Sequence, residues 1–283
     1  MEQAKISIIT VCYNSCINIE KTIKSVLSQN YDNIEYIIID GKSTDGTIEI
    51  IQKYSNNIDI IISEPDNGIY DAMNKGIKHS SGEWLMFMNA GDTYISSDSL
   101  KNFISNLTEG IRILRGNIIR IYPNFKTEST GITKQEPGIM DMFNGTFHHQ
   151  ASLIQKTLFD EFGYYSTQYR LMSDWKFFFD CVILHNQKTK YVDFPVAYFA
   201  MDGASTINTI KYRKEQLDYL TQIYGSELVE VMNEVSIIRK NKVLSLYCNL
   251  YTKAINSMSP KVFNRLLTLK KMSLKKIIGL KNN

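Results

Sequence analysis

Residues 82–92 have the sequence Gly-Glu-Trp-Leu-Met-Phe-Met-Asn-Ala-Gly-Asp, in which five apolar residues lead directly into a polar turn. A short run of consecutive apolar residues is typical of a strand buried on both faces of a parallel sheet. Ligands of open α/β sheets bind where such strands end, at their carboxyl edge. Asp92 could therefore hold a divalent metal beside Gly91, or it could simply cap the turn, since Asp and Gly are both common turn residues.

The first 90 residues alternate between strand and helix patterns. Apolar runs cover residues 6–11, 34–39, 58–62 and 84–88, and a segment with helical spacing of apolar residues separates each run from the next. This rhythm predicts right-handed βαβ units and a parallel sheet. The turns that follow these strands should bring several polar side chains to one edge of the sheet: Tyr13, Asn14, Asp40, Asp66 and Asp92.

The rest of the chain is less regular, and its pattern becomes helical from about residue 210. We expect an α/β domain over residues 1–205 and a helical extension over residues 206–283. Within the first of these, the patterns predict one or two strands over residues 111–121, a loop over 122–140, a helix over 174–184, and strands over 191–201 that are broken at Pro195.

Composition places the chain among ordinary globular proteins, with 43% hydrophobic and 22% charged residues. A net charge of +3 is too small to indicate nucleic acid as a partner. The four cysteines form no CxxC pair, which argues against a zinc site or a disulfide framework and favours a reducing compartment. The start of the chain is not a signal peptide, and no apolar run approaches the roughly 20 residues of a spanning helix. We therefore expect a cytoplasmic protein.

The segment from Lys261 to Lys281 contains seven basic residues and no acidic residue, with apolar residues interleaved. A basic amphipathic helix of this kind can lie on an anionic membrane, here the inner face of the cell membrane. The alternative is a helix that packs its apolar face on the domain and leaves its lysines in solvent.

Two common nucleotide-binding motifs are absent from the sequence. The first strand is not followed by GxGxxG, and no GxxxxGK[ST] occurs. An ordinary dinucleotide-binding fold and a P-loop NTPase are therefore excluded. A nucleotide could still bind in a pocket for its base and ribose, with a metal on its diphosphate.

Several stretches, in their order along roughly residues 5–200, together resemble family 2 glycosyltransferases of the GT-A fold, and in particular bacterial enzymes of surface-polysaccharide synthesis. They are residues 6–14 with Thr10-x-x-Tyr13-Asn14, residues 40–47, residues 64–68, Asp71-x-x-Asn74-x-Gly76, residues 82–92, His149-Gln150 and Asp174-Trp175.

The resemblance implies an inverting glycosyltransferase, of the hexosyl or N-acetylhexosaminyl class, with residues 1–205 as its catalytic domain. It would move a sugar from a nucleotide-diphosphate donor, expected to be a UDP-sugar, to a glycan or lipid-linked acceptor. In such an enzyme, Asp174 would be the catalytic base, Asp92 would bind the metal, and the remaining positions would contact the donor: Thr10, Tyr13, Asn14, Asp40, Asp66, Asn89, Gly91 and His149.

The metal motif departs from the family pattern. Asn89 and Gly91 stand where aspartates are usual, so Asp92 is the only carboxylate there. The Asn89 amide oxygen can still assist, and Mn²⁺ or Mg²⁺ on a donor diphosphate needs few protein ligands. This departure leaves a second possibility open, a non-catalytic module that binds nucleotide sugars or glycans.

Other interpretations stay open for individual residues. Asp174 could be a helix N-cap, and His148 and His149 could be buried structural histidines. A nucleotidyltransferase would share the α/β architecture, but residues 12–15 lack the Gly- and Lys-rich loop that it needs after the first strand.

Overall fold

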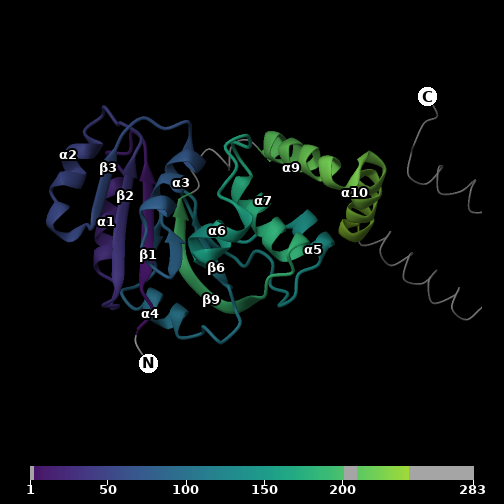
Figure 1. Cartoon of the computed structure of the whole chain (residues 1–283), viewed down its shortest axis with the longest axis horizontal. Helices are drawn as coiled ribbons and strands as arrows, with labels where there is room; N and C mark the ends of the chain where they lie inside the picture. The colour runs from purple at the N-terminus through teal and green to yellow at the C-terminus, as the bar shows by residue number, and fades with distance from the viewer. Residues whose placement is uncertain (1–2, 201–208, 242–283) are drawn as a thin grey trace, which may run out of the picture. The chain divides into compact units, whose positions relative to one another are not determined.

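The computed structural model describes residues 3–200 and 209–241 (Figure 1). The chain divides into two compact units, Met1–Gly225 and Ser226–Asn283. The first contains helix α9 (Thr209–Tyr224), whereas the sequence analysis placed these residues in the C-terminal extension. In the second unit the structure describes helix α10 (Ser226–Lys240). The basic segment 261–281 lies outside the described residues.

The first half of the sheet is parallel, as the sequence predicts. Strand β1 pairs in parallel with β2 and with β4, and β2 pairs in parallel with β3, giving the order β3-β2-β1-β4. In Figure 1, α1 and α2 lie on one side of these strands and α3 lies on the other. The elements are β1 (Ile6–Cys12), α1 (Ile19–Leu27), β2 (Ile34–Asp40), α2 (Thr47–Gln52), η1 (Ser55–Asn57), β3 (Ile60–Ser63), α3 (Ile69–His79) and β4 (Trp84–Phe87).

Side chains that alternate along the strands fill both faces of this half. Ile8 is buried in one core cluster with Ile23 of α1, whereas Ile9 points toward α3. A Cβ atom added to Gly76 of α3 would lie 2.4 Å from Ile9 Cγ2. Glycine at this position therefore allows α3 to pack closely against β1.

Strand β4 is the point at which the sheet changes direction. It pairs in parallel with β1 on one side and antiparallel with β8 on the other, and all four of its residues are buried. The sheet continues in the order β8-β6-β9-β5, and β7 pairs with β6. The second half consists of β5 (Thr93–Tyr94), α4 (Ser99–Ile104), β6 (Ile113–Ile121), β7 (Lys126–Ser129), α5 (Ile139–Asn144), η2 (His149–Ala151), β8 (Ser152–Gln155), α6 (Thr157–Phe162), α7 (Ser173–Phe179), η3 (Asp180–Leu184) and β9 (Thr189–Ala200).

Two expectations for the second half were wrong in detail, and one alternative does not hold. The loop expected over residues 122–140 contains β7, whose polar sequence carries little strand signal. Pro195 does not break β9, because it lies at a register shift opposite Asn117, where a strand tolerates proline. Asp174 is not an N-cap, since Met172 holds that position and Asp174 is the second residue of α7.

Helix α9 is held against the segment that contains α7. The Tyr219 hydroxyl of α9 donates to the Asp180 carboxylate, and the backbone N–H of Leu171 donates to Glu215 Oε2 over 3.0 Å. Through these contacts α9 becomes part of the wall of the site described below. Within residues 3–200 and 209–241, no helix combines the length and apolar character that crossing a bilayer would require.

Candidate active site

A cavity of about 810 Å³ opens where β1 and β4 end and where η2 and α7 meet that edge. It brings together side chains that are far apart in the sequence, including both acids to which the sequence analysis gives chemical roles. The predicted site residues that line it are Tyr13, Asp66, Asn89, Asp92, His149 and Asp174.

Asp92 is fixed at the end of the turn that follows β4. Its side chain is almost fully buried, at 4% exposure, and Gln150 Nε2 donates to its Oδ2 over 3.2 Å. The turn itself is tied to α1, because Thr22 Oγ1 accepts from Gly91 N and donates to the Asp92 carbonyl. Gly91 has φ +108°, a conformation that favours glycine, so it shapes the turn.

Two side chains hold Asp174, one at each of its carboxylate oxygens, and the backbone of Trp175 also donates to the carboxylate. The Tyr70 hydroxyl donates to Oδ1 over 2.8 Å, and His149 Nδ1 lies 3.2 Å from Oδ2. Burial acts to raise the pKa of Asp174, but the hydrogen bond from His149, followed by that from the Tyr70 hydroxyl, outweighs it and holds the pKa below its ordinary value. The group is therefore ionised at neutral pH and can accept a proton.

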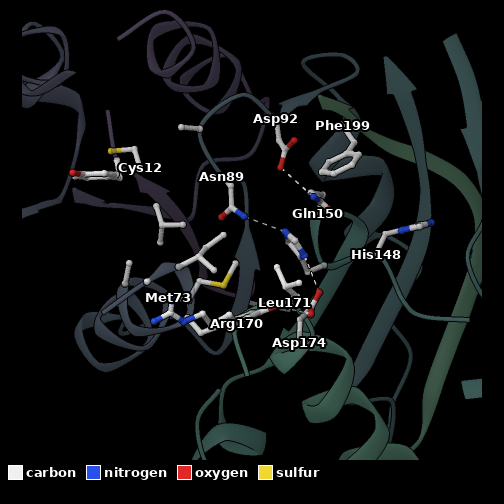
Figure 2. A pocket seen from close by; sticks show the side chains of 18 of the residues that line it. Cys12, Met73, Asn89, Asp92, His148, Gln150, Arg170, Leu171, Asp174 and Phe199 are labelled. Carbon is white, nitrogen blue, oxygen red and sulfur yellow. Dashed lines mark hydrogen bonds and ion pairs between the residues drawn. The ribbon is translucent and has the colours of Figure 1, made fainter. Parts of the chain in front are cut away.

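His149 connects the two ends of the site. Figure 2 shows dashed lines from Asn89 and from Asp174 to one imidazole ring between them. Asn89 Nδ2 lies 3.1 Å from His149 Nε2. With Asn89 in this orientation, Nε2 accepts a hydrogen bond and Nδ1 carries the proton that faces Asp174. The Asn89 Oδ1 atom is buried and has no hydrogen-bond partner.

Tyr13 and Asp66 lie near each other in the lining of the cavity. A Cβ atom added to Gly41 would lie 2.4 Å from Asp66 Oδ2 and 3.2 Å from the Tyr13 ring. The loop after β2 therefore passes close to both side chains. Tyr13 is 64% exposed, so one face of its ring is available to a flat ligand.

Four predicted donor contacts, Thr10, Asn14, Asp40 and Gly91, are not among the lining residues. Asp40 is fully buried and accepts from Ser43 N over 3.0 Å and from Ser63 Oγ over 2.6 Å. Their roles as donor contacts stay predictions. Their hydrogen bonds connect the ends of neighbouring strands, the turns that follow them and helix α1. Thr10 Oγ1 donates to the Met88 carbonyl, and Asn14 Oδ1 accepts from Thr44 N.

The sequence analysis assigned no role to several residues that line the cavity or hold its acids. Gln150 was quoted only as part of a family motif, and Tyr70 lies between two such motifs. Their positions in or beside these motifs were the only sequence features that could have indicated a role in the site. His148, for which the sequence analysis left a structural role open, also lines the cavity and is half-buried; burial, followed by the charge of Arg120, lowers its pKa to about 3, which keeps it neutral. The remaining members of this group are Arg120, Arg170 and Tyr212.

The donor atoms suit a hard divalent cation, with few protein ligands. Asp92 offers a carboxylate and Asn89 has an oxygen without a partner, and oxygen atoms are the ligands that Mg²⁺ and Mn²⁺ prefer. Among the described residues, no three His, Cys, Asp or Glu side chains form a metal-binding group. An ion at this site would need further ligands from a bound substrate.

A family model described as "Glycosyl transferase family 2" matches residues 7–174, from β1 to Asp174. The chain belongs to glycosyltransferase family 2. The match ends at Asp174, so the family region contains all three aspartates that line the cavity: Asp66, Asp92 and Asp174.

Named relatives of this family-2 chain are also glycosyltransferases. The chain is 29% identical over 236 residues to the PGL/p-HBAD biosynthesis glycosyltransferase of Mycobacterium bovis, covering 80% of this chain and 88% of that protein. It is 35% identical over 125 residues to glycosyltransferase AglE of Haloferax volcanii, covering 42% and 41% of the two chains.

Solved structures show the same fold. TarS of S. aureus, in complex with UDP, has a TM-score of 0.58 at 20% identity over 69% of this chain, and the match spans 60% of the crystallised TarS chain. The mannosyltransferase PcManGT of Pyrobaculum calidifontis, in complex with GDP-Man and Mn²⁺, has a TM-score of 0.64 at 14% identity, covering 97% of this chain and 81% of that one. The fold of the family-2 chain is therefore the GT-A fold, as the sequence predicts.

Proposed function

We propose that this chain is an inverting glycosyltransferase that moves a sugar from a UDP-sugar to a hydroxyl group of a glycan or lipid-linked acceptor in surface-polysaccharide synthesis. The observation that carries this proposal is that Asp92 and Asp174 line one cavity. In a direct displacement at the anomeric carbon, one of these acids can hold a metal ion at the leaving diphosphate. The other can take the proton of the attacking hydroxyl group.

Asp174 would act as the general base. The acceptor oxygen attacks the anomeric carbon, the bond from that carbon to the diphosphate oxygen breaks, and the acceptor proton passes to the Asp174 carboxylate. The Asp174 carboxylate accepts hydrogen bonds from Tyr70, from His149 and from the backbone of Trp175, and has four lone-pair positions, so one stays available for the acceptor. A single attack from the face opposite the leaving group inverts the configuration at the anomeric carbon.

Asp92 would hold a Mn²⁺ or Mg²⁺ ion together with the donor diphosphate, and such an ion supplies positive charge to the leaving nucleoside diphosphate. Gln150 orients the Asp92 carboxylate through its hydrogen bond. Arg120 and Arg170 line the same cavity, where their charges would favour phosphate groups. Tyr13 would stack on the nucleoside base, and Asp66 would continue the nucleoside pocket.

The donor class rests on relatives as well as on the site. TarS was crystallised with UDP and UDP-GlcNAc, and PcManGT with GDP-Man and Mn²⁺. We therefore rank UDP-sugars first and GDP-mannose second for this chain.

A panel of nucleotide sugars tests the proposal. Thermal unfolding of the full chain should shift upward with one UDP-sugar, and the shift should be larger with Mn²⁺ than with EDTA. The same donor should then give a glycosylated product with a hydroxyl acceptor. A donor that raises the unfolding temperature of the wild type but is not transferred to any acceptor would instead indicate a non-catalytic binding module.

Contact with a membrane is a separate part of the proposal. The acceptor of such an enzyme would lie at the inner face of the cell membrane, and residues 261–281 carry the basic amphipathic pattern that binds anionic lipid. The chain should float with anionic vesicles in a density gradient and should stay at the bottom with neutral vesicles. If the chain floats equally with both kinds of vesicle, or with neither, the proposed membrane contact is wrong.

A further inference from the structure

We propose that His149 is a positioning residue: its Nδ1–H fixes the orientation of the Asp174 carboxylate toward the acceptor, and Asn89 in turn fixes the orientation of the imidazole. This inference rests on the proposed role of Asp174 as the base. It gives His149 a different task from the donor contact expected from the sequence.

The contacts form a continuous series from the end of β4 to α7. Asn89 Nδ2 and His149 Nε2 are 3.1 Å apart, and His149 Nδ1 and Asp174 Oδ2 are 3.2 Å apart. Both the imidazole and the carboxylate are only 16% exposed, so water competes weakly for these bonds. A carboxylate held on both oxygens has little freedom to rotate, which keeps its remaining lone pairs in fixed directions.

The direction of the Asn89 amide decides which proton the imidazole carries. An Nε2 atom that accepts from Asn89 leaves the single proton on Nδ1, where it points at Asp174. The opposite tautomer would place a nitrogen lone pair against a carboxylate oxygen. Asn89 stands where the family usually has an aspartate, and here it provides the donor that sets this tautomer.

The other ionisable groups facing Asp174 keep a constant charge around neutral pH. Burial, followed by the charge of Asp174, raises the pKa of each nearby tyrosine, and His148 is neutral because burial lowers its pKa. Because H149N and H149Q both remove the imidazole, a difference between their acidic limbs reports on the donor to Asp174. The tyrosines are Tyr70 of α3, Tyr165 before α7 and Tyr212 of α9. Two further charged residues, Asp92 and Arg170, line the same cavity.

Two substitutions separate the two contacts of the imidazole. An asparagine amide reaches about as far as Nδ1 of histidine, whereas a glutamine amide reaches about as far as Nε2. His149→Asn can therefore keep a donor for Asp174 and lose the Asn89 contact, and His149→Gln can keep the Asn89 contact and lose the donor for Asp174. His185→Gln is the matched control, since His185 stacks on Phe162 outside the cavity.

The experiment measures kcat against pH, the KM of the donor and the thermal midpoint for these variants, with Asp174→Asn as reference. For H149Q we expect kcat to fall by about 10- to 100-fold, with the acidic limb moved to higher pH by about one to two units. H149N should keep a limb close to that of the wild type, and H185Q should match the wild type throughout.

The opposite results overturn the inference. If H149Q keeps the wild-type limb while Asp174→Asn is inactive, His149 does not position the base, although the proposed function stands. If Asp174→Asn keeps its kcat, the proposed function itself fails.

A measurement on the wild-type chain covers the case in which H149Q does not fold. Nitrogen-15 spectra of labelled histidine, assigned with H149N, should show His149 protonated on Nδ1 at neutral pH. Protonation on Nε2 alone would contradict the inference.

Discussion

The carboxyl edge of strands β1 to β3 and the segment from η2 to α7 both contain an acid held by hydrogen bonds, but the two acids differ in their access to the cavity. On the first edge, Asp40 is fully buried and accepts hydrogen bonds from Ser43 and Ser63. In the second region, Asp174 keeps 16% of its side chain exposed and lines the cavity, so a ligand can reach it. Hydrogen bonding alone therefore does not separate the two acids, whereas access to the cavity does.

The largest effect expected from this comparison follows the change Asp174→Asn. The variant loses the base but keeps a side chain of the same shape, so kcat should fall by about 10²- to 10⁴-fold. The thermal midpoint should stay close to that of the wild type. Initial rates at saturating donor, together with a melting curve, check both statements. A variant with near-normal turnover would place the base elsewhere.

Asp40→Asn should lower the stability of the fold and leave catalysis largely unchanged. The amide nitrogen would face a donor, either Ser43 or Ser63, so a buried hydrogen bond is lost and the free energy of unfolding should fall by about 1–3 kcal/mol. The KM of the donor should change by less than about tenfold, which corresponds to 1.4 kcal/mol. Urea unfolding and initial rates measure these quantities. A larger rise in KM at unchanged stability would support the nucleoside contact predicted from the sequence.

The smallest effect on turnover is expected at Glu35, which lies on β2 at the end opposite Asp40. Burial acts to raise the pKa of Glu35, but hydrogen bonds from Ser7 Oγ and from the Ser81 backbone and side chain, together with Lys5, outweigh it and hold the pKa at about 2. The folded value lies below the ordinary value of about 4.3. Glu35 therefore contributes stability above that pH, and the contribution is lost as the pH falls toward about 2.

Glu35→Gln should remove that dependence. Urea unfolding at pH 7 and at pH 3 should show that the variant is less stable than the wild type at pH 7, by about 1–3 kcal/mol, and that the gap narrows at pH 3. An equal gap at both pH values would mean that the charge of Glu35 plays no part. Turnover at pH 7 should be unaffected in the folded variant, since Glu35 does not line the cavity.

The two regions also differ in how far the sequence predicts them. The alternating strands and helices of residues 6–88 carry strong periodic signals, so the parallel sheet and its polar edge follow from local pattern alone. Strand β7 has a polar sequence, and Pro195 is accommodated by a register shift against β6. Both features depend on the neighbouring strand, which no local pattern records.

The same distinction applies to the site. The family motifs place Asp92, His149 and Asp174 in the sequence, and all three line one cavity. Their partners are set by packing between distant segments: Tyr70 reaches Asp174 across 104 positions, and Gln150 reaches Asp92 across 58. Such contacts exist only once η2 and α7 have packed against the end of β4, so the sequence could not supply them.

The most direct test of the shared cavity is a titration of the UDP-sugar donor, with and without Mn²⁺, into the Asp92→Asn and Asp174→Asn variants. Asp92→Asn should lose the Mn²⁺-dependent part of donor binding, whereas Asp174→Asn should bind the donor as the wild type does, and neither should turn it over at a normal rate. Metal-dependent donor binding at wild-type strength in Asp92→Asn, together with normal turnover in Asp174→Asn, would contradict the account.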